Sequence, residues 1–194
     1  MNSLSEVSLF DFKKALDQAS VRVFQIIFIG LTAGVVVFSF VVFIVSLQNN
    51  NAMYNNEMIP LLNVISIINF VIAISSIMIG KFISDRQFSE STLQSAVKLD
   101  YTDKQGSSLN LTPAQKCVSV IRTASLIRLA TMEGAAFFGL ITTMQVVQNG
   151  IGIIEPIYYA NILSILPLFI YVVTNFPSVE RIEEIFQKKI QKTL

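Results

Sequence analysis

Long uninterrupted runs of apolar residues dominate the pattern along this chain. Residues 23–47, 59–80 and 156–175 contain no charged side chain. A helix needs about 20 apolar residues to cross the roughly 30 Å hydrocarbon core of a bilayer. The three runs therefore predict three membrane-spanning helices. A β-barrel would instead show alternating strands of about ten residues.

A further long helix is predicted from residue 113 to the glycine at 150. Thr112 followed by Pro113 is typical of a helix start, and no helix breaker follows until Asn149-Gly150. Such a helix of about 36 residues would be about 54 Å long. We expect only residues 129–147 to lie in hydrocarbon, because the first half carries the basic residues Lys116, Arg122 and Arg128.

Both ends of the chain have the spacing of short amphipathic helices. Near the start, Ser3 and Glu6 have capping-box spacing, and an apolar stripe follows at Leu9, Phe12 and Leu16. Near the end, Phe176-Pro177 would stop the fourth span and Ser178 could cap another helix, whose apolar stripe is Val179, Ile182, Phe186 and Ile190. Such helices usually cover an apolar face, so we favour surface packing over recruitment of a partner.

These elements predict an all-α fold, an integral membrane four-helix bundle flanked by amphipathic interfacial helices. Residues 1–22 form the first flanking segment, residues 23–175 the membrane domain with its third helix starting at 113, and residues 176–194 the tail. The alternative for residues 23–47 is a cleaved signal peptide. The run is too long for the 7–15-residue apolar region of such a signal, and no small-residue cleavage motif follows it.

The composition supports a membrane protein and argues against several classes of function. Apolar residues make up 53% of the chain and charged residues 14%, against about a quarter charged in a soluble domain. There is no histidine and there is one cysteine, Cys117, so we expect no catalytic site, metal site or cofactor. The net charge of +1 gives no indication of a nucleic-acid partner.

The distribution of basic residues predicts the orientation. Residues 48–58 and 148–155 contain no lysine or arginine, although the chain has 14 of them. Under the positive-inside rule, both termini and residues 81–116 lie in the cytoplasm. We therefore expect a multi-pass protein of the bacterial inner membrane.

Glu133 is the candidate functional residue, because ionisable side chains inside a membrane are costly and usually functional. It lies about four residues inside the predicted boundary, or roughly 6 Å deep. Arg128 is five positions earlier, about 140° away around the helix, and cannot face it. Glu133 then needs a partner from another helix, a water-filled cavity or a proton of its own. The candidate cluster comprises Glu133, Arg128, Arg122, Ser75, Ser76 and Tyr171.

Small residues surround Glu133 at spacings that let helices approach closely. They are Ala130, Thr131, Gly134, Ala135 and Gly139. The structural interpretation is that helix three packs against its neighbours here and that Glu133 is a hydrogen-bonding group between helices.

Residues 122–138 resemble a signature of small four-helix bacterial membrane proteins, through Arg122, Arg128 and Glu133-Gly134. Those proteins also have two spans, a polar loop, a last span, a proline and an amphipathic tail. Phe176 stands here where a basic residue would be expected before the proline. No activity is established for that family, so the resemblance implies an architecture only.

Residues 129–140 also resemble the ion-carrying helix of rotary ATP synthase proteolipids, in which a membrane carboxylate exchanges a proton. The dense glycine run of a tight ring is absent, because residues 23–47 contain only Gly30 and Gly34.

Three classes of function follow. The favoured one is a structural or interaction component of the cell membrane, whose partners are the lipid bilayer and a second copy or another membrane protein. The alternative is a proton- or ion-coupled transport subunit that uses Glu133. An intramembrane enzyme comes last, because the chain lacks histidine, a nucleophile–base pair and a metal-ligand set.

Overall fold

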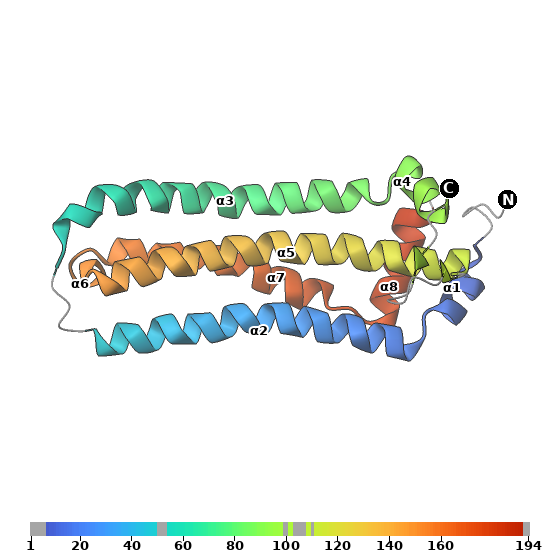
Figure 1. The fold of residues 1–194 in the computed structure, drawn as a ribbon, viewed down its shortest axis with the longest axis horizontal. Helices are drawn as coiled ribbons and strands as arrows, with labels where there is room; N and C mark the ends of the chain where they lie inside the picture. Colours follow the sequence, from blue (N-terminus) through green and yellow to red (C-terminus); the bar gives the residue numbers. More distant parts are fainter. Residues whose placement is uncertain (1–6, 50–53, 99–100, 103–107, 110, 192–194) are drawn as a thin grey trace. The chain divides into compact units, whose positions relative to one another are not determined.

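The computed structural model describes residues 7–49, 54–98, 101–102, 108–109 and 111–191, and it is almost entirely helical there. Within these residues, four helical segments are long and apolar enough to cross a membrane. They are α2 (Gln18–Gln48), η2 with α3 (Asn56–Met58 and Ile59–Arg86), α5 (Pro113–Gln148), and η3 with α7 (Pro156–Ile165 and Leu166–Asn175). Figure 1 shows these elements in chain order.

Helix α5 has the start and end that its sequence predicts. Thr112 and Gln115 cap it reciprocally: the Gln115 N–H donates to Thr112 Oγ1 at 3.3 Å, and the Thr112 N–H donates to Gln115 Oε1 at 2.9 Å. At the other end Gly150 has a φ of 64°, and its N–H donates to the Val147 carbonyl. A left-handed residue favours glycine, which explains why the helix stops there.

The fourth span departs from a regular α-helix in its first half. Residues Pro156–Ile165 form a 3₁₀ helix (η3), and the α-helix α7 begins only at Leu166. Pro167 has no N–H to offer the Leu163 carbonyl, and the Leu166 N–H bonds to that carbonyl instead. The proline thus fixes the place where one helix type gives way to the other.

The chain divides into two compact units, and each is described by itself. The apolar unit comprises Ile29–Gly80 and Leu129–Thr174. The basic unit comprises Met1–Phe28, Lys81–Arg128 and Asn175–Leu194. All 14 lysines and arginines of the chain belong to the basic unit, whereas the apolar unit has three glutamates and no basic residue.

In the apolar unit, α5 lies between α2 and α3 (Figure 1). The rings of Phe38 on α2 and Phe137 on α5 are 5.9 Å apart. At one end Leu62 on α3 and Val146 on α5 form a buried cluster together with Ile151 and Tyr158. Ile151 belongs to the short helix α6 (Ile151–Ile154), which closes the turn between α5 and η3.

The apolar unit exposes apolar side chains and buries polar ones. Phe40, Ile67 and Val173 are 64%, 65% and 79% exposed, whereas Asn69 and Asn161 are at most 1% exposed. A soluble protein rarely exposes a contiguous apolar surface of this kind. The distribution fits helices whose outer surface faces hydrocarbon.

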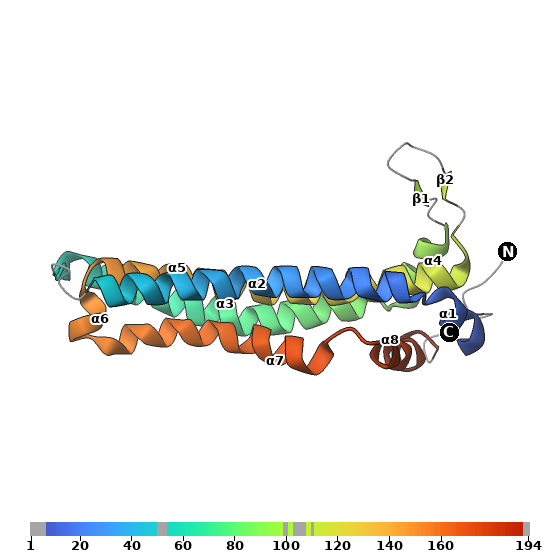
Figure 2. The same cartoon turned by 90° about the horizontal axis from the view of Figure 1, so that it is seen from below.

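The basic unit contains the ends of the chain. Helix α1 (Leu9–Ala15) lies beside α8 (Val179–Ile185), which continues as the π-helical turn η4 (Phe186–Ile190) (Figure 2). The Phe12 ring stacks on the Phe186 ring with centroids 4.0 Å apart, and both rings are buried. The two terminal helices therefore cover each other's apolar faces.

A serine caps each of the two terminal helices. Ser3 and Glu6 lie outside the described residues, and the described cap of α1 is Ser8, whose hydroxyl accepts from the Asp11 N–H. Ser178 caps α8 as expected. Val179 departs from the predicted apolar stripe, because it is 38% exposed while Ile182, Phe186 and Ile190 are buried.

Between α3 and α5 the basic unit has a helix, α4 (Glu90–Lys98), and a two-residue antiparallel pair, β1 (Tyr101–Thr102) with β2 (Ser108–Leu109) (Figure 2). The described residues between α3 and α5 thus form a helix and a short strand pair.

Candidate functional site

The predicted site residues fall into different units. Arg122 and Arg128 belong to the basic unit, whereas Glu133, Ser75, Ser76 and Tyr171 belong to the apolar unit.

Glu133 is half-buried on α5, on the side that faces α2. Its Oε1 lies 3.9 Å from the position that a Cβ at Gly34 would occupy, and Phe137 Cζ lies 3.4 Å from the same point. Gly34 thus leaves the space that these two side chains use. Among the described residues, Glu133 has no hydrogen-bond or ion-pair partner.

Of the residues grouped with Glu133 in the apolar unit, Ser76 bonds within its own helix. The Ser76 hydroxyl is buried and donates to the Ala73 carbonyl on its own helix at 2.8 Å. Ser75 is half-buried and Tyr171 is buried. Their grouping with Glu133 stays a prediction.

The small residues of α5 do not act together. Ala135 and Gly139 are buried, Thr131 is half-buried, and Ala130 and Gly134 are exposed. Ala130 and Gly134 share one side of α5, because residues four apart are neighbours on a helix surface. Packing of all five residues against neighbouring helices stays a prediction.

Three buried polar side chains of the apolar unit and the half-buried Ser66 gather between α3 and η3. Asn69 Nδ2 donates to the Oδ1 of Asn161 at 3.0 Å and to its backbone carbonyl at 3.1 Å. Asn161 Nδ2 donates to Ser66 Oγ and to the Tyr158 carbonyl, both at 2.8 Å. The Ser164 hydroxyl donates to the Asn161 carbonyl at 2.9 Å. We call Ser66, Asn69, Asn161 and Ser164 the asparagine cluster.

The asparagine cluster connects η3 to α3 through hydrogen bonds, and α5 packs against it at Gly139. A Cβ at Gly139 would collide with the Ser164 hydroxyl and would lie 2.5 Å from the Asn161 carbonyl oxygen. Asn69 Oδ1 is buried and has no hydrogen-bond partner among the described residues. A side-chain hydrogen bond between membrane helices contributes only about 0.6 kcal/mol on average, so an asparagine in an apolar run is by itself a weak indication of such a cluster.

Arg122 joins α5 to the start of α2 within the basic unit. Its Nη2 donates to the Ser20 carbonyl at 3.0 Å, and its Cζ lies 6.0 Å from the centroid of the Phe24 ring. The Ser20 N–H in turn donates to the Asp17 carboxylate at 2.7 Å. The hydrogen bonds from Ser20, followed by the nearby Arg122 charge, hold the pKa of Asp17 below its ordinary value.

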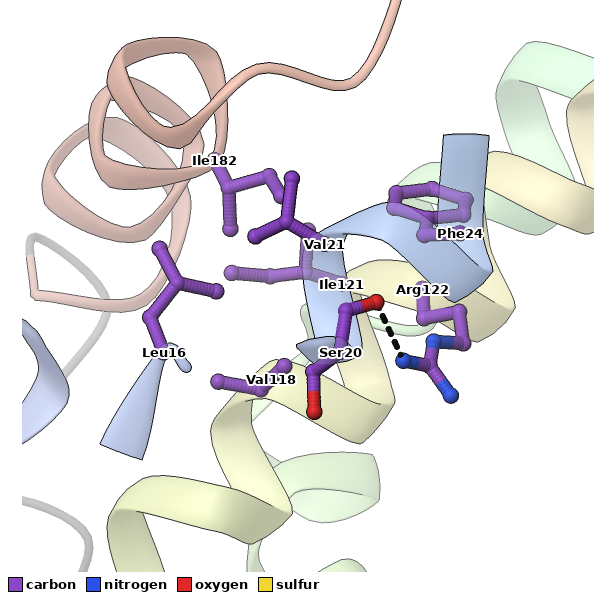
Figure 3. Close-up of a pocket in the computed structure, with 8 residues that line it drawn as sticks. All are labelled: Leu16, Ser20, Val21, Phe24, Val118, Ile121, Arg122 and Ile182. Carbon is purple, nitrogen blue, oxygen red and sulfur yellow. Dashed lines mark hydrogen bonds between the residues drawn. The ribbon is translucent and has the colours of Figure 1, made fainter. Parts of the chain in front are cut away.

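A small hollow lies beside this contact (Figure 3). Its volume is about 10 Å³, which is enough for about one water molecule and too small for a ligand. Leu16, Val21 and Ile182 converge on it, while Arg122 reaches the Ser20 carbonyl at its edge (Figure 3). We conclude that Arg122 has a structural role in joining helices.

A larger hollow of about 220 Å³ lies between α4 and α5 in the basic unit. Its lining consists of uncharged side chains: Gln87, Thr92, Ser95, Ala96, Ser119, Val120 and Thr123. A general acid or base needs a titratable group at the site, and this lining offers none. The described residues also include no group of three or more acidic, cysteine or histidine side chains able to hold a metal ion.

Comparison of the chain with protein-family models, with curated proteins and with solved structures finds no match in any of the three. The function is therefore argued from the residues alone.

Proposed function

We propose that this chain is a multi-pass membrane protein of the bacterial inner membrane whose role is structural or in the assembly of partners. In this proposal the helices of the apolar unit cross the bilayer. The basic unit, with both chain ends, lies in the cytoplasm. The bilayer and a second copy or another membrane protein are its partners.

The observation that carries the proposal is the partition of charge. The basic unit has all 14 lysines and arginines and 10 acidic residues, whereas the apolar unit has three acidic residues and no basic ones. Positive charge concentrated on one side of the spans is the strongest determinant of orientation. The exposed apolar side chains of the apolar unit provide the surface that lipid would cover.

A structural role, rather than an enzymatic one, is supported by what the described polar groups do. The asparagine cluster holds η3 against α3, and Arg122 holds α5 against α2. In both places the polar atoms bond mainly to backbone or side-chain groups of neighbouring helices. The asparagine cluster and Arg122 therefore serve to hold helices together.

Cysteine labelling in intact cells tests the topology. Cys117 is 1% exposed, so it should react little in the folded protein and can stay in place. We expect Tyr54→Cys, in the loop before α3, to react with a membrane-impermeant thiol reagent added outside. Ser95→Cys, at an exposed position of α4, should react only after permeabilisation. Equal labelling of both variants in intact cells, or labelling of Ser95→Cys alone, would contradict the proposal.

Proton- or ion-coupled transport is the second candidate function, and the position of Glu133 favours it. This half-buried acid on α5 has no described partner and lies beside Gly34 of α2. Glu133→Gln keeps the hydrogen-bonding capacity and removes the titratable proton. Loss of proton flux from proteoliposomes with unchanged thermal unfolding would support transport. A change in stability alone, with no flux in the wild type, would support packing.

A further inference from the structure

The basic unit has more cations than its own acids neutralise. Of its described acids, Glu183 pairs with Lys13, Glu184 pairs with Arg181 and Lys188, and Asp85 pairs with Lys189. Asp17 is used in capping α2. Four exposed cations have no acidic partner among the described residues: Lys14, Arg22, Lys81 and Arg86. We call these four residues the basic collar.

Two members of the basic collar stand at the boundaries of the apolar runs. Arg22 immediately precedes the uncharged residues 23–47, and Lys81 immediately follows the uncharged residues 59–80. If those runs cross hydrocarbon, these two charges are the first to reach the headgroup layer. Their long side chains can extend toward phosphate groups while the stems stay in apolar surroundings.

Each of three collar cations shares a helix face with an exposed large apolar side chain. Phe10 lies four residues before Lys14 on α1, Ile26 lies four residues after Arg22 on α2, and Phe82 lies four residues before Arg86 on α3. Phe10, Ile26 and Phe82 are 75%, 68% and 67% exposed. Residues four apart are neighbours on a helix surface.

A cation beside an exposed apolar side chain fits the boundary between headgroups and acyl chains. An ordinary aqueous surface would leave Phe10 and Phe82 in contact with water, at a cost proportional to their apolar area. An acidic protein partner would match the charges, but it would not explain why apolar side chains accompany them on three separate helices. An anionic lipid surface accounts for both features.

We propose that the basic collar binds the phosphate groups of anionic phospholipids in the inner leaflet, with Phe10, Ile26 and Phe82 inserted beside them. The inference rests on the proposed membrane insertion, and it adds a preference for lipid charge. The paired cations Lys13, Lys188 and Lys189 take no part, because carboxylates of the chain already neutralise them.

Native mass spectrometry of the full chain tests the proposal. The protein is released from micelles that contain equal amounts of phosphatidylglycerol and phosphatidylcholine with identical acyl chains, and the bound lipids are counted. The collar variant is Arg22→Gln with Lys81→Gln and Arg86→Gln. The control variant is Lys13→Gln with Lys188→Gln and Lys189→Gln, which removes the same net charge from cations that are already paired.

We expect the wild type and the control variant to retain more phosphatidylglycerol than phosphatidylcholine. The ratio should fall about fivefold for each collar charge removed, until it reaches one. A wild-type ratio of one, or an equal fall in both variants, would overturn the proposal. Displacement of phosphatidylglycerol by an equal concentration of inorganic phosphate would also overturn it, because the site would then bind free anions.

A separate measurement distinguishes this inference from the proposed function. The wild-type chain is reconstituted into vesicles of phosphatidylcholine alone, and carbonate extraction reports whether it is integral. Extraction from those vesicles counts against membrane insertion itself. Retention in the vesicles, together with a lipid ratio of one, overturns only the preference for anionic lipid.

Discussion

Gly134 and Gly139 show how much two identical residues on one helix can differ. They lie five positions apart on α5, and the sequence places both in one small-residue pattern. A Cβ at Gly134 would meet nothing within 4 Å, whereas a Cβ at Gly139 would collide with the Ser164 hydroxyl and the Asn161 carbonyl. Close helix approach is thus required at one position and absent at the other.

Replacing Gly139 by alanine should therefore destabilise the protein. We expect Gly139→Ala to lower the free energy of unfolding by about 1–3 kcal/mol, because η3 must move away and strain the asparagine cluster. Gly134→Ala is the matched control and should be neutral, or stabilising by up to about 1 kcal/mol through helix propensity. Thermal unfolding in detergent measures both variants. Equal destabilisation would mean that the two glycines have similar surroundings.

Asp17 makes a contribution to stability that depends on pH. Its carboxylate accepts the Ser20 N–H at 2.7 Å at the start of α2, and hydrogen bonds from Ser20 lower its pKa. A lowered folded-state pKa means that the stabilisation is complete above the unfolded-state value. The stabilisation is lost as the pH falls through the folded-state value.

We therefore expect the protection of the Ser20 amide against hydrogen exchange to decrease in acid. Asp17→Ala should show the decrease already at neutral pH, because the cap is missing. Asp17→Asn should keep the protection at both pH values, because asparagine caps helices as well as aspartate and does not titrate here. Protection in the wild type that is independent of pH down to about 2, well below the ordinary aspartate pKa of about 3.9, would exclude this role.

At the scale of whole elements, the two terminal helices depend on each other. Helices α1 and α8 are only seven residues each, and isolated helices of that length are unstable in water. Stacking of Phe12 on Phe186 buries both rings and supplies the missing stability. The sequence predicts two amphipathic helices and does not indicate that they cover one another.

Removing the buried ring should release both terminal helices together. We expect Phe12→Ala to cost about 3–5 kcal/mol within this pair and to raise hydrogen exchange in α1 and in α8. Phe10→Ala, on the same helix, should leave exchange in α8 unchanged, since Phe10 is 75% exposed. If exchange rises in α1 alone, α8 is held by other contacts.

At the scale of the whole molecule, the two units differ in net charge and in which side chains they expose. The apolar unit carries a net charge of −3 and the basic unit +4. The apolar unit exposes many large apolar side chains and buries Asn69 and Asn161. The basic unit buries Phe12, Ile182 and Phe186 and exposes Lys13, Lys14 and Lys188. Each unit thus suits a different solvent.

The four long helical segments and both ends of α5 could be predicted from the sequence alone. Runs of uncharged residues, a Thr-Pro start and an Asn-Gly end are local signals, and local signals act wherever the residues occur. The same holds for the concentration of lysine and arginine outside residues 23–80 and 129–175. These features required no knowledge of how one helix faces another.

Which polar and small residues meet could be seen only once the helices were packed together. Asn69 and Asn161 are 92 positions apart and form the asparagine cluster, while Glu133 and the serines chosen as its partners do not form a described group. Which residues meet depends on the rotation of each helix about its axis. That rotation is set by contacts such as Gly139 against Ser164, which a single apolar run in lipid leaves undetermined because it is apolar on every side.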